Sequence, residues 1–107
     1  MTRTVLLTGG ASGSGRARAA RNAALSAESA PRGVSRDVIA AACVEGTGLF
    51  GGGLPAERRR ALIEETRGGR PGTVEDVAAA AHFLAPPGAR HLTGQTPHVN
   101  GGAHTTR

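Results

Sequence analysis

The chain has 107 residues, a formal net charge of +5 and a single cysteine. A chain of this length forms at most one domain with a small core, and only 19 residues are Leu, Ile, Val or Phe, which is few for an apolar interior. One cysteine excludes an internal disulfide, and the sequence has neither an apolar run of membrane-spanning length nor a secretory signal pattern. We therefore expect a small cytoplasmic protein with no membrane contact.

The positive charge comes from 13 arginines, because the sequence contains no lysine. A basic excess favours phosphate, nucleic acid or an anionic surface as a partner. The densest basic run is Arg58-Arg59-Arg60, but Glu57, Glu64 and Glu65 surround it, and no tyrosine or tryptophan is present to stack on a base. This pattern predicts a solvated helix face and disfavours nucleic-acid binding.

The first half of the chain predicts a strand, a helix and a second strand. Residues 3–7 form a short apolar run that leads into glycines, which is typical of a buried strand entering a turn. Alanines dominate from Gly13 to about Ala30 and favour a helix, which Pro31 ends. Residues 38–44 are continuously apolar, as in a parallel strand buried on both faces, and Cys43 is expected there as a small buried hydrophobic residue.

The second half predicts two helices and a final strand. Five of the eight residues 46–53 are glycines, which predicts a loop, and a helix with a broad polar face follows from Pro55 to about Thr66. Thr73 is expected to cap a helix over residues 74–85. The last strand, residues 96–100, carries Pro97, which favours an edge position.

A glycine-rich segment, residues 8–15, lies between the first strand and the first helix. Glycines there let the backbone approach a pyrophosphate, whose charge would be met by free N–H groups and by the positive end of the helix. The alternative is a glycine-rich turn that binds nothing. The candidate cofactor-binding residues are Thr8, Gly9, Ser12, Gly13, Ser14 and Gly15.

The pattern Thr-Gly-x-x-x-Gly-x-Gly after an N-terminal strand resembles the cofactor motif of short-chain dehydrogenases/reductases. Residues 69–78 and 92–102 resemble the C-terminal helix and final strand of that family, and residues 27–34 resemble the end of the helix after its active site. The likeness is greatest to the 3-oxoacyl carrier-protein reductases. It implies a reduced Rossmann-like α/β fold of about three parallel strands with flanking helices, one domain over residues 1–102 with a tail over residues 103–107, and NAD or NADP as cofactor.

The same resemblance shows what this chain lacks. The family uses a tyrosine as acid or base at the substrate carbonyl and a lysine that lowers its pKa, and neither residue type occurs here. Asn22 aligns with the lysine, and Ala41 and Ala42 align with a Pro-Gly pair beside the nicotinamide. We therefore expect an internally truncated oxidoreductase homologue with no catalytic residues, inactive alone and with weak or lost dinucleotide binding.

Another hypothesis is a non-enzymatic module. The family builds oligomer interfaces from its last helix and strand, so this chain could associate with itself or with a full-length relative through those elements. An anion-binding role for the arginines is a further alternative. The four histidines lack metal-site spacing, and no metal is expected.

Overall fold

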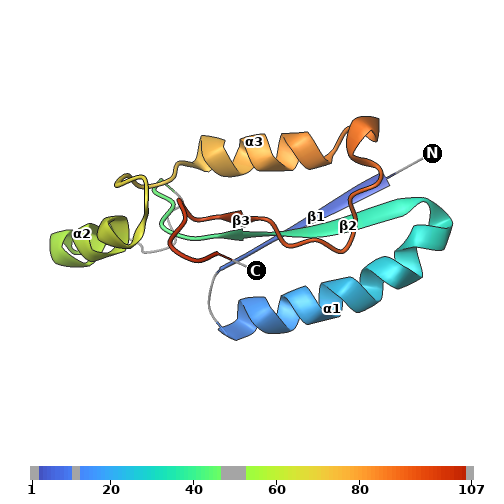
Figure 1. The fold of residues 1–107 in the computed structure, drawn as a ribbon, viewed down its shortest axis with the longest axis horizontal. Coiled ribbons are helices and arrows are strands. Elements are labelled where there is room, and N and C mark those ends of the chain that lie inside the picture. Colours follow the sequence, from blue (N-terminus) through green and yellow to red (C-terminus); the bar gives the residue numbers. More distant parts are fainter. Residues whose placement is uncertain (1–2, 11–12, 47–52, 106–107) are drawn as a thin grey trace.

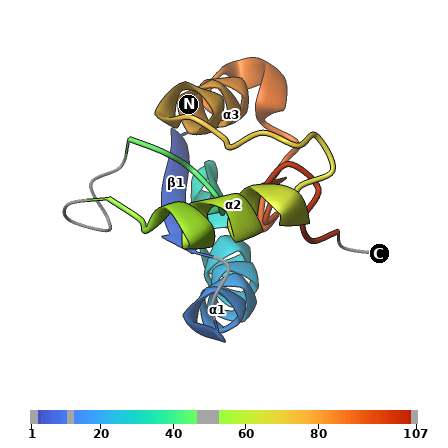
Figure 2. The ribbon, with the colours of Figure 1, turned by 90° about the vertical axis from the view of Figure 1, so that its left-hand side faces the viewer.

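The structure is a computed structural model that describes residues 3–10, 13–46 and 53–105, with side chains from Ala20 onward. The elements follow in the order β1 (Arg3–Gly10), α1 (Gly13–Ser29), β2 (Val34–Ala41), α2 (Ala56–Glu65), α3 (Val74–Leu84) and β3 (His98–Val99), with short 3₁₀ turns at Ala30–Arg32 and Pro87–Ala89. The strands form one parallel sheet in the order β1-β2-β3. Helix α1 covers one face and α3 the other (Figures 1 and 2). The predicted α/β fold is therefore confirmed, with the first strand beside the second.

Strand β2 forms the centre of the molecule, since both other strands and the helices α1 and α3 pack against it. Its residues Val38 and Ile39 are 2% and 0% exposed, as expected for a strand covered on both faces. The sequence predicted this strand at residues 38–44, whereas it begins at Val34 and ends at Ala41. The early residues were missed because three of the four, Ser35, Arg36 and Asp37, are polar.

Two of those early residues, Ser35 and Asp37, are buried. The Asp37 Oδ1 atom accepts a hydrogen bond from the backbone N–H of Gln95 at 3.0 Å, while Oδ2 has no hydrogen-bond partner within the described ranges. Burial raises the pKa of Asp37, against the opposing effect of the Gln95 hydrogen bond. A carboxyl group thus occupies a position that an apolar pattern cannot predict.

Cys43 lies beyond the end of β2, so its predicted place inside a strand was wrong. Its φ angle is 55°, a left-handed value that is uncommon for any residue but glycine, and its side chain is half-buried. The turn lets the Gly72 N–H donate to the Cys43 carbonyl at 2.8 Å and pairs Val44 with Gly72. This contact ties the end of β2 to the segment that precedes α3.

Helix α1 packs against β2 and β1. Asn22 and Ser26 are its buried residues among the described side chains, at 1% and 7% exposed. Gly94 crosses the helix so closely that a Cβ atom there would lie 2.7 Å from Ser26 Oγ, and its φ of +72° also requires glycine. The segment that leads to β3 is thereby held against the end of α1.

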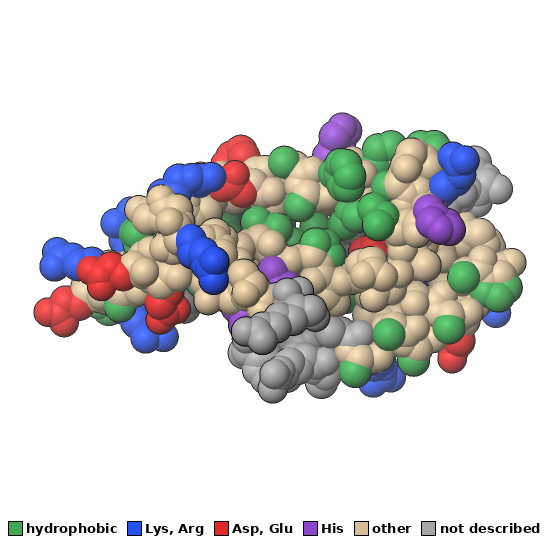
Figure 3. All heavy atoms as spheres, in the orientation of Figure 1, with side chains coloured by type: hydrophobic (Ala, Val, Ile, Leu, Met, Phe, Trp, Pro, Cys, Tyr) green, Lys and Arg blue, Asp and Glu red, His purple; other side chains and the backbone are tan. Residues whose placement is uncertain are grey.

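Helix α2 begins after Pro55 and has no buried residue, which confirms its broad polar face. Charged side chains gather over it in Figure 3, while hydrophobic side chains gather near α3. Arg59 forms an ion pair with Glu45. The prediction that the arginine run lies on a solvated helix face is confirmed, because all three of its arginines are exposed.

Helix α3 carries the predicted cap. The Thr73 hydroxyl accepts from the Asp76 N–H at 3.2 Å, and the Asp76 carboxylate accepts from the Thr73 N–H at 2.9 Å. The hydrogen bond from the Thr73 N–H is the largest cause of a lowered pKa at Asp76. The Arg70 guanidinium, 3.3 Å from the carboxylate, lowers this pKa further. Along the helix, Leu84 is buried, whereas Phe83 is 68% exposed.

Strand β3 is limited to His98 and Val99, which is shorter than the predicted residues 96–100. Pro97 has no N–H to donate, and the strand lies at the edge of the sheet as expected. The Pro97 carbonyl still accepts from the Ala40 N–H at 3.0 Å. Across the described ranges, no helix combines the length and apolar character needed to cross a membrane.

We expect Thr73→Ala to destabilise the protein by about 1 kcal/mol, because the first turn of α3 loses a side-chain acceptor. Urea unfolding followed by circular dichroism measures the change. Thr73→Ser keeps the hydroxyl and should remain close to the parent. Equal stability of all three proteins would contradict the role of the cap.

We expect Asp37→Asn to stabilise the protein near pH 8 by roughly 1–3 kcal/mol, because an amide removes a buried, half-partnered carboxylate. The pKa of Asp37 is raised in the folded state above its ordinary value of 3.8. Protonated Asp37 therefore contributes its full stability below pH 3.8, and this contribution is lost as the pH rises through the raised pKa. The advantage of the variant should therefore shrink toward acid pH. Urea unfolding at several pH values tests this, and a difference independent of pH would contradict it.

Candidate functional site

The glycine-rich segment lies at the carboxyl edge of the sheet. The register pairs Thr8 with Ile39 and Gly9 with Ala40, so the predicted residues Thr8 and Gly9 stand at the end of β1. Gly13, Ser14 and Gly15 open α1. The predicted residue Ser12 lies outside the described residues. In open α/β sheets, ligands bind at this carboxyl edge.

The start of α1 has the electrostatic character of an anion site. A helix leaves its first N–H groups without intrahelical partners, and aligned peptide dipoles make that end positive. Helix α1 is 17 residues long and has no acidic residue in its first turn. A negative group held at the loop would therefore meet a positive charge that the helix itself does not offset.

The three strands end side by side at this edge. Gly10 pairs with Ala41, and Ala41 pairs with Val99. The next residue, Ala42, donates its N–H to the Val99 carbonyl at 3.1 Å. Ala41 and Ala42, the positions expected beside a nicotinamide, thus lie one strand away from the loop, and their side chains are methyl groups.

Cys43 is the nearest nucleophilic side chain after these alanines. Burial raises the pKa of its thiol, and the neighbouring charges of Glu45 and Glu65 raise it further. A thiol with a raised pKa forms little of the reactive thiolate at neutral pH. This environment does not favour nucleophilic chemistry at Cys43.

Asn22, which was expected to stand in place of the family's lysine, is not at the edge. It is 1% exposed, and its Nδ2 atom donates to the Arg36 carbonyl at 3.5 Å. Its Oδ1 atom has no hydrogen-bond partner in the part of the chain that the structure describes. The side chain therefore lies in the contact between α1 and β2, where a dinucleotide cannot touch it.

Sequence reasoning did not single out Asp37, although an acidic residue directly before an apolar run was a visible signal. The register places it opposite Leu6, in the middle of the sheet and away from the carboxyl edge. Over the described ranges, no three side chains of the His, Cys, Asp and Glu types come together as metal ligands would.

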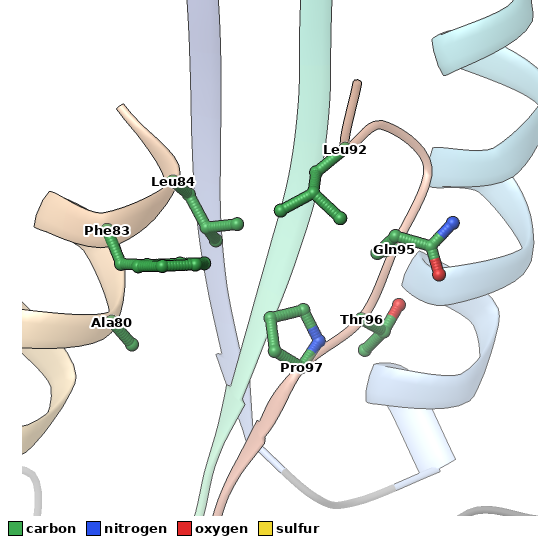
Figure 4. A pocket seen from close by; sticks show the side chains of 7 residues that line it. All are labelled: Ala80, Phe83, Leu84, Leu92, Gln95, Thr96 and Pro97. Carbon is green, nitrogen blue, oxygen red and sulfur yellow. The ribbon is translucent and has the colours of Figure 1, made fainter. Parts of the chain in front are cut away.

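A separate hollow of about 420 Å³ lies between α3 and the segment before β3 (Figure 4). Phe83 and Leu84 line it from the helix, and Leu92 and Pro97 line it from the segment. Its walls are mainly apolar, and Phe83 and Leu92 are also exposed. The hollow is on the α3 side of the sheet and belongs to a different part of the molecule from the glycine-rich loop.

Known proteins match this chain over most of its length. The family model described as enoyl-(acyl carrier protein) reductase matches residues 13–104, a range that begins just after β1. The 3-oxoacyl-(acyl-carrier-protein) reductase FabG of Vibrio cholerae is 39% identical over 77 residues, which cover 72% of this chain and 31% of the relative. The enzymes of the same name from Salmonella typhimurium and Escherichia coli are each 35% identical over 80 residues, covering 75% of this chain and 32% of theirs.

The chain spans about a third of the length of the curated relatives it matches. The family match nevertheless extends from the first turn of α1 to the residues after β3, and it includes β2, α2 and α3. The fold is the reduced Rossmann-like arrangement that the sequence predicted. This protein belongs to the short-chain dehydrogenase/reductase family.

Proposed function

We propose that this chain binds a nicotinamide dinucleotide through its phosphates and does not reduce a carbonyl substrate by itself. The observation that carries the proposal is the meeting of three features at one edge: the end of β1 at Gly10, the start of α1 at Gly13 and the end of β2 at Ala41. Backbone N–H groups and a helix dipole suffice to hold phosphate. Both NAD and NADP fit this mode of binding.

The lack of turnover follows from the side chains that carbonyl reduction requires. A general acid must lie within hydrogen-bond reach of the carbonyl oxygen and must have a pKa suited to neutral pH. The sequence supplies no tyrosine or lysine, Asn22 is buried away from the edge, and the Cys43 thiol has a raised pKa. The 3-oxoacyl thioesters named for the relatives are the substrate class on which this proposal is best tested.

A second candidate is a non-enzymatic module that binds a full-length relative through α3 and the segment before β3. The exposed side chains Phe83 and Leu92 favour it, at 68% and 37% exposure beside an apolar hollow. Large exposed apolar groups of this kind mark interaction surfaces more often than isolated aliphatic residues do.

We expect NADPH or NADH at about 1 mM to shift the amide resonances of Gly9 and of residues 13–15, because the bound phosphates would contact those N–H groups. Ser14→Glu places a negative charge in the first turn of α1, where it favours the helix but repels phosphate, and should weaken binding about tenfold or more. The matched control is Ala24→Glu, which adds the same charge at an exposed position farther along α1. Unchanged resonances at saturating cofactor, or equal affinities of the two variants, would contradict phosphate binding.

The same preparation, mixed with NADPH and a 3-oxoacyl thioester, should show no cofactor oxidation above the rate without protein. The Vibrio cholerae relative serves as a positive control for the assay. Sustained oxidation by this chain would overturn the absence of turnover while leaving the binding result untouched.

A further inference from the structure

The outer edge of β1 has no partner strand within the described residues. β1 is eight residues long and pairs with β2 along its whole length, and the sheet order leaves it at one side. Helix α3 covers one face of the sheet (Figures 1 and 2) and packs against β2 and β3. One row of backbone N–H and C=O groups along β1 therefore has no strand beside it within the described residues.

The hydrogen bonds of β2 show which groups of β2 face β1. Val38 donates its N–H to the Gln95 carbonyl and Ala40 donates to the Pro97 carbonyl, so these residues face the β3 side. Successive residues of a strand direct their peptide groups to opposite neighbours. The intervening residue Ile39 must then face β1.

The register also determines which backbone groups of β1 face β2. Thr8 stands opposite Ile39, and in a parallel ladder a residue bonds to the two residues that flank its opposite. Ile39 therefore bonds to Leu7 and Gly9. It follows that Thr4, Leu6 and Thr8 direct their N–H and C=O groups to the open edge.

Nothing in the sequence of β1 protects this edge. Natural edge strands are blunted by proline, by lysine, by bulges or by short length. β1 has none of these along residues 4–8, where the sequence is Thr-Val-Leu-Leu-Thr. Threonine and valine are enriched in strands. An unprotected edge of this length is a template for another strand.

The opposite edge of the sheet excludes open-ended stacking. Strand β3 has two residues, and Pro97 directly before it lacks an N–H. Addition of one copy's β1 to another's β3 would gain few hydrogen bonds. In contrast, when the β1 strands of two copies pair about a two-fold axis, each copy contributes the same long edge. The resulting dimer leaves no β1 edge free.

We propose that two copies of this chain associate through antiparallel pairing of their β1 strands, centred on Leu6. Leu6 of each copy then faces Leu6 of the other, and Thr4 of each faces Thr8 of the other. All three residues belong to the set whose peptide groups point outward, so each facing pair exchanges hydrogen bonds in both directions. The two sheets become one continuous sheet with β3 at both ends.

Sedimentation velocity of the whole chain tests this dimer. The expected mass is twice 10.7 kDa. Leu6→Pro removes an outward N–H and is tolerated at a strand edge, so it should give a folded monomer. Leu7→Pro is the matched variant, because it removes an N–H that bonds to β2, and it should lower the melting temperature. A wild-type chain that is monomeric at about 1 mM, or a Leu6→Pro variant that stays dimeric, would overturn the proposal.

Two further measurements keep the test decisive if Leu6→Pro fails to fold. Phe83→Ser removes the exposed aromatic of α3 and should leave the dimer intact; a monomeric Phe83→Ser would place the interface on α3 and refute pairing at β1. In the wild type, the amides of Thr4, Leu6 and Thr8 should be protected from hydrogen exchange in concentrated solution and exposed on dilution, whereas Val5 and Leu7 keep their protection. Free exchange of the first three amides in concentrated protein would also refute it.

Discussion

The hydrogen bonding of β2 along both of its edges is the constraint on which the rest of this structure depends. The strand is the one element that contacts β1, β3, α1 and α3 within the described ranges. Val38 and Ile39 are almost completely buried there, in a chain that has few large apolar residues. Few other apolar side chains are buried among the described residues, so the apolar burial that the structure describes is concentrated around this strand.

The position of the glycine-rich loop is a consequence of that pairing. The register that sets Thr8 opposite Ile39 also brings Gly10 beside Ala41, so the start of α1 meets the end of β2. Phosphate binding at such a place uses backbone N–H groups and a helix dipole, which do not depend on particular side chains. Carbonyl reduction does depend on them. A member of the family can therefore keep the first property without the second, and Asn22, expected in place of the family's lysine, is buried against the Arg36 carbonyl.

The sequence predicted the elements well where a local pattern determines them. The cap at Thr73 forms as expected because both of its partners lie within one turn of helix, and Pro97 restricts β3 to an edge. The start of β2 was missed because Asp37 is a polar residue that is nevertheless buried. It accepts a hydrogen bond from Gln95, a residue distant in the chain. Cys43 was misplaced for a similar reason, since its turn is held by Gly72. Of the candidate site, the location of the loop at the carboxyl edge followed from the strand–loop–helix order, whereas the burial of Asn22 against the Arg36 carbonyl required the tertiary structure.

Hydrogen exchange at single residues of β2 tests the central constraint most directly. Val38, Ala40 and Ala42 donate to the segment that contains β3, so their protection reports on that side alone. Asp37, Ile39 and Ala41 alternate with them, and their N–H groups are protected only if β1 pairs with β2. We expect slow exchange for both sets. Slow exchange of the first set with free exchange of the second would show that β1 does not join the sheet, and the site at its end would not exist.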